Sequence, residues 1–137
     1  MNAVVHFEMP GEDMERMKKF YTETFGWKIN QMGAEFGNYV VVQTDETDEQ
    51  GMLKKTNRIN GGFYKKSDSP LSAVPSVVIA VPDIRQAMEK VRMAGGEVIG
   101  GGNKAGEPDE IPGIGLYISI KDTEGNRVGL LQPATQM

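Results

Sequence analysis

The chain has 137 residues, of which 39% are hydrophobic and 25% charged, so its composition is that of one globular domain or two half-domains sharing a core. A net charge of −4 argues against nucleic acid as a partner, because phosphate binding needs a concentrated basic face. The lack of cysteine excludes disulfides and thiolate chemistry, and no apolar run approaches the roughly 20 residues that span a bilayer, so we expect a cytoplasmic protein.

The first predicted elements are a strand and a helix. Val4–Met9 alternates, which places His6 and Glu8 on one face of a strand and Val5 and Phe7 on the other. Pro10-Gly11 is expected to break this strand. Asp13–Phe25 has apolar residues at helical spacing and predicts an amphipathic helix that ends at Gly26.

Three further strands are predicted in the first half, at Trp27–Met32, Asn38–Thr44 and Arg58–Lys65. The Gly61-Gly62 pair in the last of them indicates either a bulge or a close backbone approach. The intervening Asp45–Gln50 segment has four acids in six residues. It lacks the turn glycine of a calcium loop, so a solvated loop is favoured over a metal site.

A polar linker, Lys66–Pro75, leads to a second strand-helix-strand pattern. Ser76–Val81 predicts a buried strand, and Asp83 is placed as the N-cap of a helix over Ile84–Ala94. Gly95-Gly96 ends the helix, and Glu97–Ile99 begins the next strand. The glycine-rich Gly100–Gly113 segment is interpreted as a mobile connection that can act as a lid.

The last third predicts a hairpin. Ile114–Lys121 is a strand with Leu116, Ile118 and Ile120 on one face and Tyr117 and Ser119 on the other. Asp122–Asn126 is a turn in which Gly125 and Asn126 tolerate positive φ, and Arg127–Gln132 is the closing strand.

The strand-helix unit occurs twice, 70 positions apart, which predicts duplication of a small module. We expect module one over residues 1–65, a linker over 66–75 and module two over 76–137. The predicted fold class is α+β, with two βαβββ modules forming one curved mixed sheet with a concave cleft.

The chain resembles the vicinal oxygen chelate superfamily of glyoxalase I, extradiol dioxygenases and bleomycin-resistance proteins. The resemblance rests on the repeated unit, on FYTETFGW (Phe20–Trp27) and on IPGIGLYISIKDTEGNRVGLLQ (Ile111–Gln132). Enzymes of this superfamily hold a divalent metal. The resemblance places the metal ligands at the positions of His6, Gly61 or Gly62, Ser76 and Gly129.

His6 is the only good metal ligand among these residues, and the chain has one histidine in total. Catalytic zinc needs three protein ligands, so we expect no metal and no other cofactor. The predicted function is that of a metal-free small-molecule-binding member, glyoxalase-like or bleomycin-resistance-like. The alternative is a divergent lyase, isomerase or dioxygenase-like enzyme with His6 and Glu8 as catalytic candidates, so enzymatic activity stays open.

The ligand-binding candidates share the predicted cleft: His6, Glu8, Tyr39, Ser76 and Tyr117. His6 is either a pocket residue or a remnant satisfied by a neighbour. The aromatic residues, Trp27 among them, either stack on a ligand or pack in the core. Arg127 is interpreted as a solvated surface residue rather than an anion site. The expected partners are an unknown small molecule and a second copy of the chain in a homodimer, with no nucleic acid and no membrane.

Overall fold

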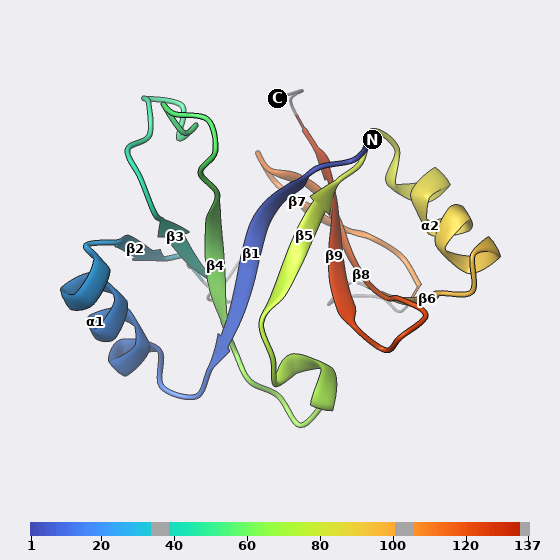
Figure 1. Cartoon of the computed structure of the whole chain (residues 1–137), viewed down its shortest axis with the longest axis horizontal. Helices are drawn as coiled ribbons and strands as arrows, with labels where there is room; N and C mark the ends of the chain where they lie inside the picture. The colour runs from blue at the N-terminus through green and yellow to red at the C-terminus, as the bar shows by residue number, and fades with distance from the viewer. Residues whose placement is uncertain (34–38, 101–105, 135–137) are drawn as a thin grey trace. The chain divides into compact units, whose positions relative to one another are not determined.

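The computed structural model of the chain describes residues 1–33, 39–100 and 106–134, and these contain two α-helices and nine strands (Figure 1). Contacts divide the chain into two compact units. We call His6–Pro75 the first module, and Ser76–Met137 with Met1–Val5 the second module. The N-terminal residues join the second module, in which the Ala3 carbonyl accepts a hydrogen bond of 2.9 Å from the Ala80 amide.

The first module is a four-stranded mixed sheet with one helix. Its strands follow the order β2-β3-β4-β1, in which β1 and β4 are parallel and the other pairs antiparallel. A short 3-10 helix, Pro70–Ser72, lies in the segment that leads to the second module. The elements are β1 (Val4–Gly11), α1 (Met14–Phe25), β2 (Lys28–Gln31), β3 (Val40–Gln43) and β4 (Asn60–Lys65).

The second module repeats this plan and adds a strand. The order is β5-β9-β8-β6, with β5 and β9 parallel, and the extra β7 pairs with β8. The two modules confirm the predicted α+β class. The elements are β5 (Ser76–Ala80), α2 (Ile84–Met93), β6 (Glu97–Gly100), β7 (Asp109–Ile111), β8 (Gly115–Lys121) and β9 (Arg127–Pro133).

The two helices begin in the same way. The Asp13 carboxylate accepts from the Arg16 amide at 3.0 Å, and the Asp83 carboxylate accepts from the Gln86 amide at 3.1 Å. Each bond satisfies an amide that the first turn of a helix leaves unpaired. The two caps stand 70 positions apart in the sequence, so the local structure supports the predicted duplication.

Each sheet buries one face under its own helix. In the first module Ile29, Val40, Val42 and Phe63 form the buried core, with Phe7, Met9 and α1 side chains packed against it. In the second module the corresponding core is made by Val81, Ile84, Met88, Ile118, Ile120 and Leu130. Alternation along the strands turns the other side chains to the helix-free face of each sheet. Those helix-free faces carry the polar residues considered below.

The structure corrects three expectations. Pro10 and Gly11 do not break β1 but pair with Tyr64 and Lys65 of β4. A Cβ on Gly11 would overlap the Met14 and Met17 side chains, so glycine here lets α1 pack closely. Gly61 and Gly62 keep regular register with β1 and β3, so β4 has no bulge at this pair.

The third correction concerns the Gly100–Gly113 connection, which contains strand β7 rather than loop alone. Residues 101–105 of this connection, and Asn38 of the predicted third strand, lie outside the described residues. In the hairpin turn, Gly125 has a φ of +89°, whereas Asn126 is not among the described positive-φ residues. No described helix is long and apolar enough to cross a membrane.

Candidate functional site

In the first module the predicted site residues His6, Glu8 and Tyr39 lie together on the helix-free face. Phe7 and Met9 pack into the core, which turns His6 and Glu8 the other way. Glu8 is only 7% exposed, and its carboxylate accepts a hydrogen bond of 3.2 Å from the Tyr39 hydroxyl. A buried carboxylate needs such donors, because burial without them is costly.

His6 is fixed by the backbone of the neighbouring strand. Its Nδ1 lies 3.2 Å from the Asn60 carbonyl oxygen, which can only accept, so Nδ1 carries a proton. The Nε2 atom is then the ring nitrogen available for other chemistry. A backbone group therefore satisfies one ring nitrogen of His6, and the ring lies on the same face of the strand as Glu8.

Gly62 is the β4 residue on the same face as these side chains. It lies opposite Glu8 in the β1–β4 register, and the Tyr39 ring covers it so closely that a Cβ would overlap ring atoms. Gly61 instead faces the core, under the Phe7 ring. Of the two glycines, Gly62 is thus the one that shares the face of His6 and Glu8, and a tyrosine ring fills the space of its missing side chain.

The second module places Ser76 and Tyr117 in a polar cluster with Ser119 and Arg127, which we call the Arg127 cluster. Arg127 Nη2 donates to Ser76 Oγ at 2.9 Å, and Nη1 donates to Ser119 Oγ at 3.4 Å. The Tyr117 hydroxyl lies 3.4 Å from Ser119 Oγ. Strands β5, β8 and β9 each supply part of the cluster.

Gly129 repeats the arrangement of Gly62. It lies opposite Ser119 on β8, and a Cβ on it would come within 2.8 Å of the Tyr117 ring. In the second module the tyrosine stands two residues before the partner of the glycine, since Tyr117 precedes Ser119. The same spacing occurs in the first module, where Tyr39 precedes Val41, the partner of Gly62. In both modules, therefore, a tyrosine covers the glycine: Tyr39, which directly precedes the antiparallel strand β3, and Tyr117 of the antiparallel strand β8.

Sequence reasoning missed Arg127, which is half-buried rather than a solvated surface residue. The signal was present: alternation along β9 puts Arg127 on the same face as Gly129, and the parallel register brings it beside Ser76. Trp27 packs in the core, with its ring stacked on Tyr21 at a centroid distance of 4.9 Å. For Trp27 the packing alternative is the correct one.

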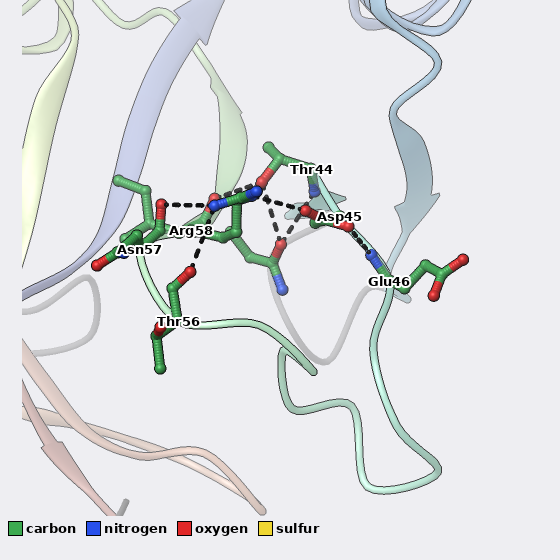
Figure 2. Close-up of polar contacts among 8 residues, drawn as sticks. Thr44, Asp45, Glu46, Thr56, Asn57 and Arg58 are labelled. Atoms are coloured by element: carbon green, nitrogen blue, oxygen red, sulfur yellow. Dashed lines mark hydrogen bonds and ion pairs between the residues drawn. The ribbon is translucent and has the colours of Figure 1, made fainter.

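The acidic segment is organised by turns and by an arginine, as Figure 2 shows. Arg58 Nε donates to the Asp45 carboxylate at 2.8 Å, and the Glu46 amide donates to the same residue at 2.7 Å. The Glu46 amide chiefly, with help from Arg58, lowers the pKa of Asp45. The Asp48 carboxylate accepts from the amides of Gln50 and Met52. These contacts support the solvated-loop interpretation.

The metal implied by the superfamily does not fit the residues at its positions. Two of them, Gly62 and Gly129, lie under tyrosine rings, and the third, Ser76, binds a guanidinium. A positive charge beside Ser76 repels a divalent cation. Among the described residues, no three histidine, cysteine or carboxylate side chains gather in a way that could hold a metal ion. His6 is left as the single metal donor of the set.

Comparisons with known proteins bear on the family. Residues 3–45 match the family model of the bleomycin resistance protein-like N-terminal region. No curated protein matches the chain. Among solved structures, a Streptomyces coelicolor methylmalonyl-CoA epimerase variant in complex with 2-nitronate-propionyl-CoA is similar, with a TM-score of 0.68 and 15% identity. The match covers 98% of this chain and 96% of the epimerase.

Two further solved structures show the same fold. The methylmalonyl-CoA epimerase of Mycobacterium tuberculosis has a TM-score of 0.65 and 12% identity, over 96% of this chain and 88% of that one. A hypothetical protein of Bacillus halodurans has a TM-score of 0.67 and 11% identity, over 99% and 97%. The fold shared over nearly the whole chain and the family match in its first module agree with the predicted resemblance. Both findings support a relation to the vicinal oxygen chelate superfamily.

Proposed function

We propose that the protein is a metal-free member of this superfamily that binds a small molecule on the helix-free faces of its sheets. One observation carries the proposal: the family's metal positions are taken by two ring-covered glycines and by a serine that binds a guanidinium. The two glycines offer no metal ligand, and the guanidinium adds a positive charge. Hydroxyl, imidazole and carboxylate groups remain on the same faces. The faces thus keep groups that recognise an organic ligand.

The chemistry of the remaining donors supports the metal-free assignment. A catalytic zinc takes three protein ligands, and non-haem iron takes two histidines and a carboxylate. His6 is the sole histidine of the chain, and its Nδ1 is engaged with the Asn60 carbonyl. Glu8 shares the face of His6, but its carboxylate is bound by the Tyr39 hydroxyl. One imidazole nitrogen does not hold zinc or iron tightly.

The test combines metal analysis with ligand screening on the purified protein. Elemental analysis is expected to give no stoichiometric divalent metal, and zinc, nickel or manganese should leave the melting temperature unchanged. Native mass spectrometry and thermal shift against a panel of aromatic and thiol-conjugate compounds should find a binder. Tight one-to-one metal binding that is abolished by His6→Ala would contradict the metal-free assignment, and a panel without any binder would contradict the binding function.

A second candidate function is proton transfer by a divergent isomerase or lyase. Glu8 favours this candidate, because a buried carboxylate that accepts a hydrogen bond from a tyrosine is a suitable base. The similar solved structures also include methylmalonyl-CoA epimerases. Exchange of a substrate α-proton for deuterium, measured by NMR on acyl-thioesters, tests it. Exchange that is lost in Glu8→Gln would support this candidate, and no exchange with any acyl-thioester would remove it.

A further inference from the structure

We propose that Thr44 and Asn60 are positioning residues for His6. Together they fix the backbone carbonyl group that binds Nδ1 of the imidazole ring, and they thereby keep Nε2 as the accepting nitrogen. The inference rests on the proposed function, in which His6 is one of the groups on the helix-free face of the first module. All three residues belong to that module.

The bond between His6 and Asn60 decides which ring nitrogen carries the proton. The Asn60 carbonyl oxygen lies 3.2 Å from Nδ1 and can only accept a hydrogen bond. A neutral imidazole has a single N–H, so Nε2 is left with its lone pair. The two residues are direct partners in the parallel β1–β4 register. The position of one carbonyl group therefore sets the chemistry of Nε2.

Side-chain bonds hold Asn60 where the regular pairing of β3 with β4 ends. That pairing stops at Gly61, one residue short of Asn60. Beyond this point the Thr44 amide donates to Asn60 Oδ1 at 2.9 Å, and the Thr44 hydroxyl donates to the Ile59 carbonyl. Because β4 lies between β3 and β1, Asn60 connects Thr44, which follows β3, to His6 on β1.

An outer contact closes the same loop but lies nearer to the solvent. Arg58 Nε donates to the Asp45 carboxylate at 2.8 Å, and these side chains are 44% and 22% exposed (Figure 2). Ion pairs at the surface contribute little to stability. Thr44, Asn60 and His6 are all half-buried, so their bonds compete less with water. We therefore assign the positioning role to Thr44 and Asn60 and not to the ion pair.

The fixed tautomer determines what His6 can contribute to the face. Nε2 can accept a hydrogen bond or a proton, and it cannot donate one. Within the part of the chain that the structure describes, the hydrogen bond of the imidazole ring is the one from Nδ1. A ring that was free to exchange tautomers would offer either nitrogen as a donor. The two positioning residues thus make the imidazole a defined acceptor.

The experiment observes the tautomer by long-range ¹H–¹⁵N NMR at alkaline pH, where an imidazole ring is neutral. The chain has one histidine, so the two ring nitrogens give one pair of signals, and a protonated nitrogen differs widely in ¹⁵N shift from an unprotonated one. We expect Nδ1 to be the protonated nitrogen in the wild type. In Asn60→Ala the ratio of the Nδ1–H to the Nε2–H tautomer should fall at least about twofold, because the carbonyl loses its anchor.

Matched variants separate positioning from general loosening of the loop. Asn60→Asp keeps an accepting oxygen and should retain the wild-type ratio. Thr44→Val removes only the hydroxyl and should lower the ratio in the same direction, which keeps the test decisive if Asn60→Ala does not fold. Arg58→Met breaks the outer ion pair and leaves both Thr44 bonds in place, so it should not change the ratio.

Three results would overturn the inference: an Nε2–H tautomer in the wild type, an unchanged ratio in both Asn60→Ala and Thr44→Val, or an equal fall in Arg58→Met. The measurement needs no ligand, so its outcome is independent of the screening panel. A panel without any binder would contradict the proposed function and leave the positioning roles standing. A binder found together with any of the three results would leave the proposed function standing without them.

Discussion

The glycines Gly62 and Gly129, at two positions where the resemblance implies metal ligands, do more than leave out a donor. A Cβ at either residue would run into the tyrosine ring from the adjacent strand, so each glycine and its tyrosine form one packing unit. The tyrosine hydroxyl then reaches a polar neighbour, Glu8 in the first module and Ser119 in the second. A side chain placed at either glycine would therefore require the aromatic ring to move.

The Gly129→Ala substitution tests this unit. In an ordinary strand position the exchange stabilises slightly, because alanine has fewer unfolded conformations to lose. Here the new Cβ would lie 2.8 Å from the Tyr117 ring, and overpacking of this kind costs about 1–3 kcal/mol. We expect the free energy of unfolding, measured by urea denaturation, to fall by that amount.

The control is a double-mutant cycle with Tyr117→Ala. Once the ring is gone, the alanine methyl group has space, so Gly129→Ala should cost much less in that background. The same cost in both backgrounds would show that the ring does not cause the strain.

At the scale of elements, the hairpin turn between β8 and β9 sets the geometry of the Arg127 cluster. The Asp122 carboxylate accepts from the backbone amides of Glu124 and Asn126 and from the Asn126 side chain, at 2.8–2.9 Å. These bonds hold the register that places Lys121 opposite Arg127 and Ser119 opposite Gly129. A one-residue slip of β9 would turn Arg127 to the core face, away from Ser76 and Ser119.

The same bonds predict a pH dependence of stability. The Asn126 side chain, then its amide, lowers the pKa of Asp122 below the ordinary 3.8. A carboxylate whose pKa is lower in the folded protein than in the unfolded protein stabilises the fold at pH values above the unfolded pKa. This stabilisation is lost as the pH falls through the pKa of the folded protein. In Asp122→Asn, urea unfolding should therefore show a shallower loss of stability below about pH 4.

The substitution Asn126→Ala provides the matched comparison, because it removes the chief donor and leaves the carboxylate in place. It too should reduce the loss of stability on acidification. If both variants lose stability with pH as steeply as the wild type, the turn does not contribute to the acid response.

Local signals explain which elements the sequence could predict. Asp13 and Asp83 are side-chain caps with a fixed local role, and both helices begin as predicted. Pro10-Gly11 misleads, because β1 continues through it by pairing with β4, which is distant in sequence. The Gly61-Gly62 pair left two interpretations open, because the Phe7 and Tyr39 rings that cover it are also distant in sequence. Strand β7 is only three residues long and depends on its pairing with β8.

In the candidate site, too, features set by neighbouring residues could be predicted, and features set by strand pairing could not. The face shared by His6 and Glu8 follows from alternation and was predicted. The bond from Arg127 to Ser76 joins residues 51 positions apart, and only the parallel pairing of β5 with β9 brings them together. The pairing of His6 with Glu8 could therefore be predicted from the sequence, whereas the contact of Arg127 with Ser76 could not.

At the scale of the molecule, each module has its own buried core, yet α1 of the first module buries no residue fully. Phe20 and Phe25 near its C-terminal end are 55% and 59% exposed, with ring centroids 6.3 Å apart. Covering such apolar surface is favourable by about 25 cal/mol per Å². We therefore expect this end of α1 to be covered by a second copy of the chain.

The prediction is a homodimer that depends on these two rings. Light scattering should give a mass near twice the 15.0 kDa of the chain, falling towards the monomer on dilution. Phe20→Ser combined with Phe25→Ser should raise the dissociation constant at least about tenfold, since each ring contributes buried apolar area. Val74→Ser removes a side chain outside α1 that is equally exposed, at 57%, and should leave the mass unchanged. A mass of 15.0 kDa at high concentration would contradict the dimer, and a dimer unaffected by the double substitution would exclude α1 as its interface.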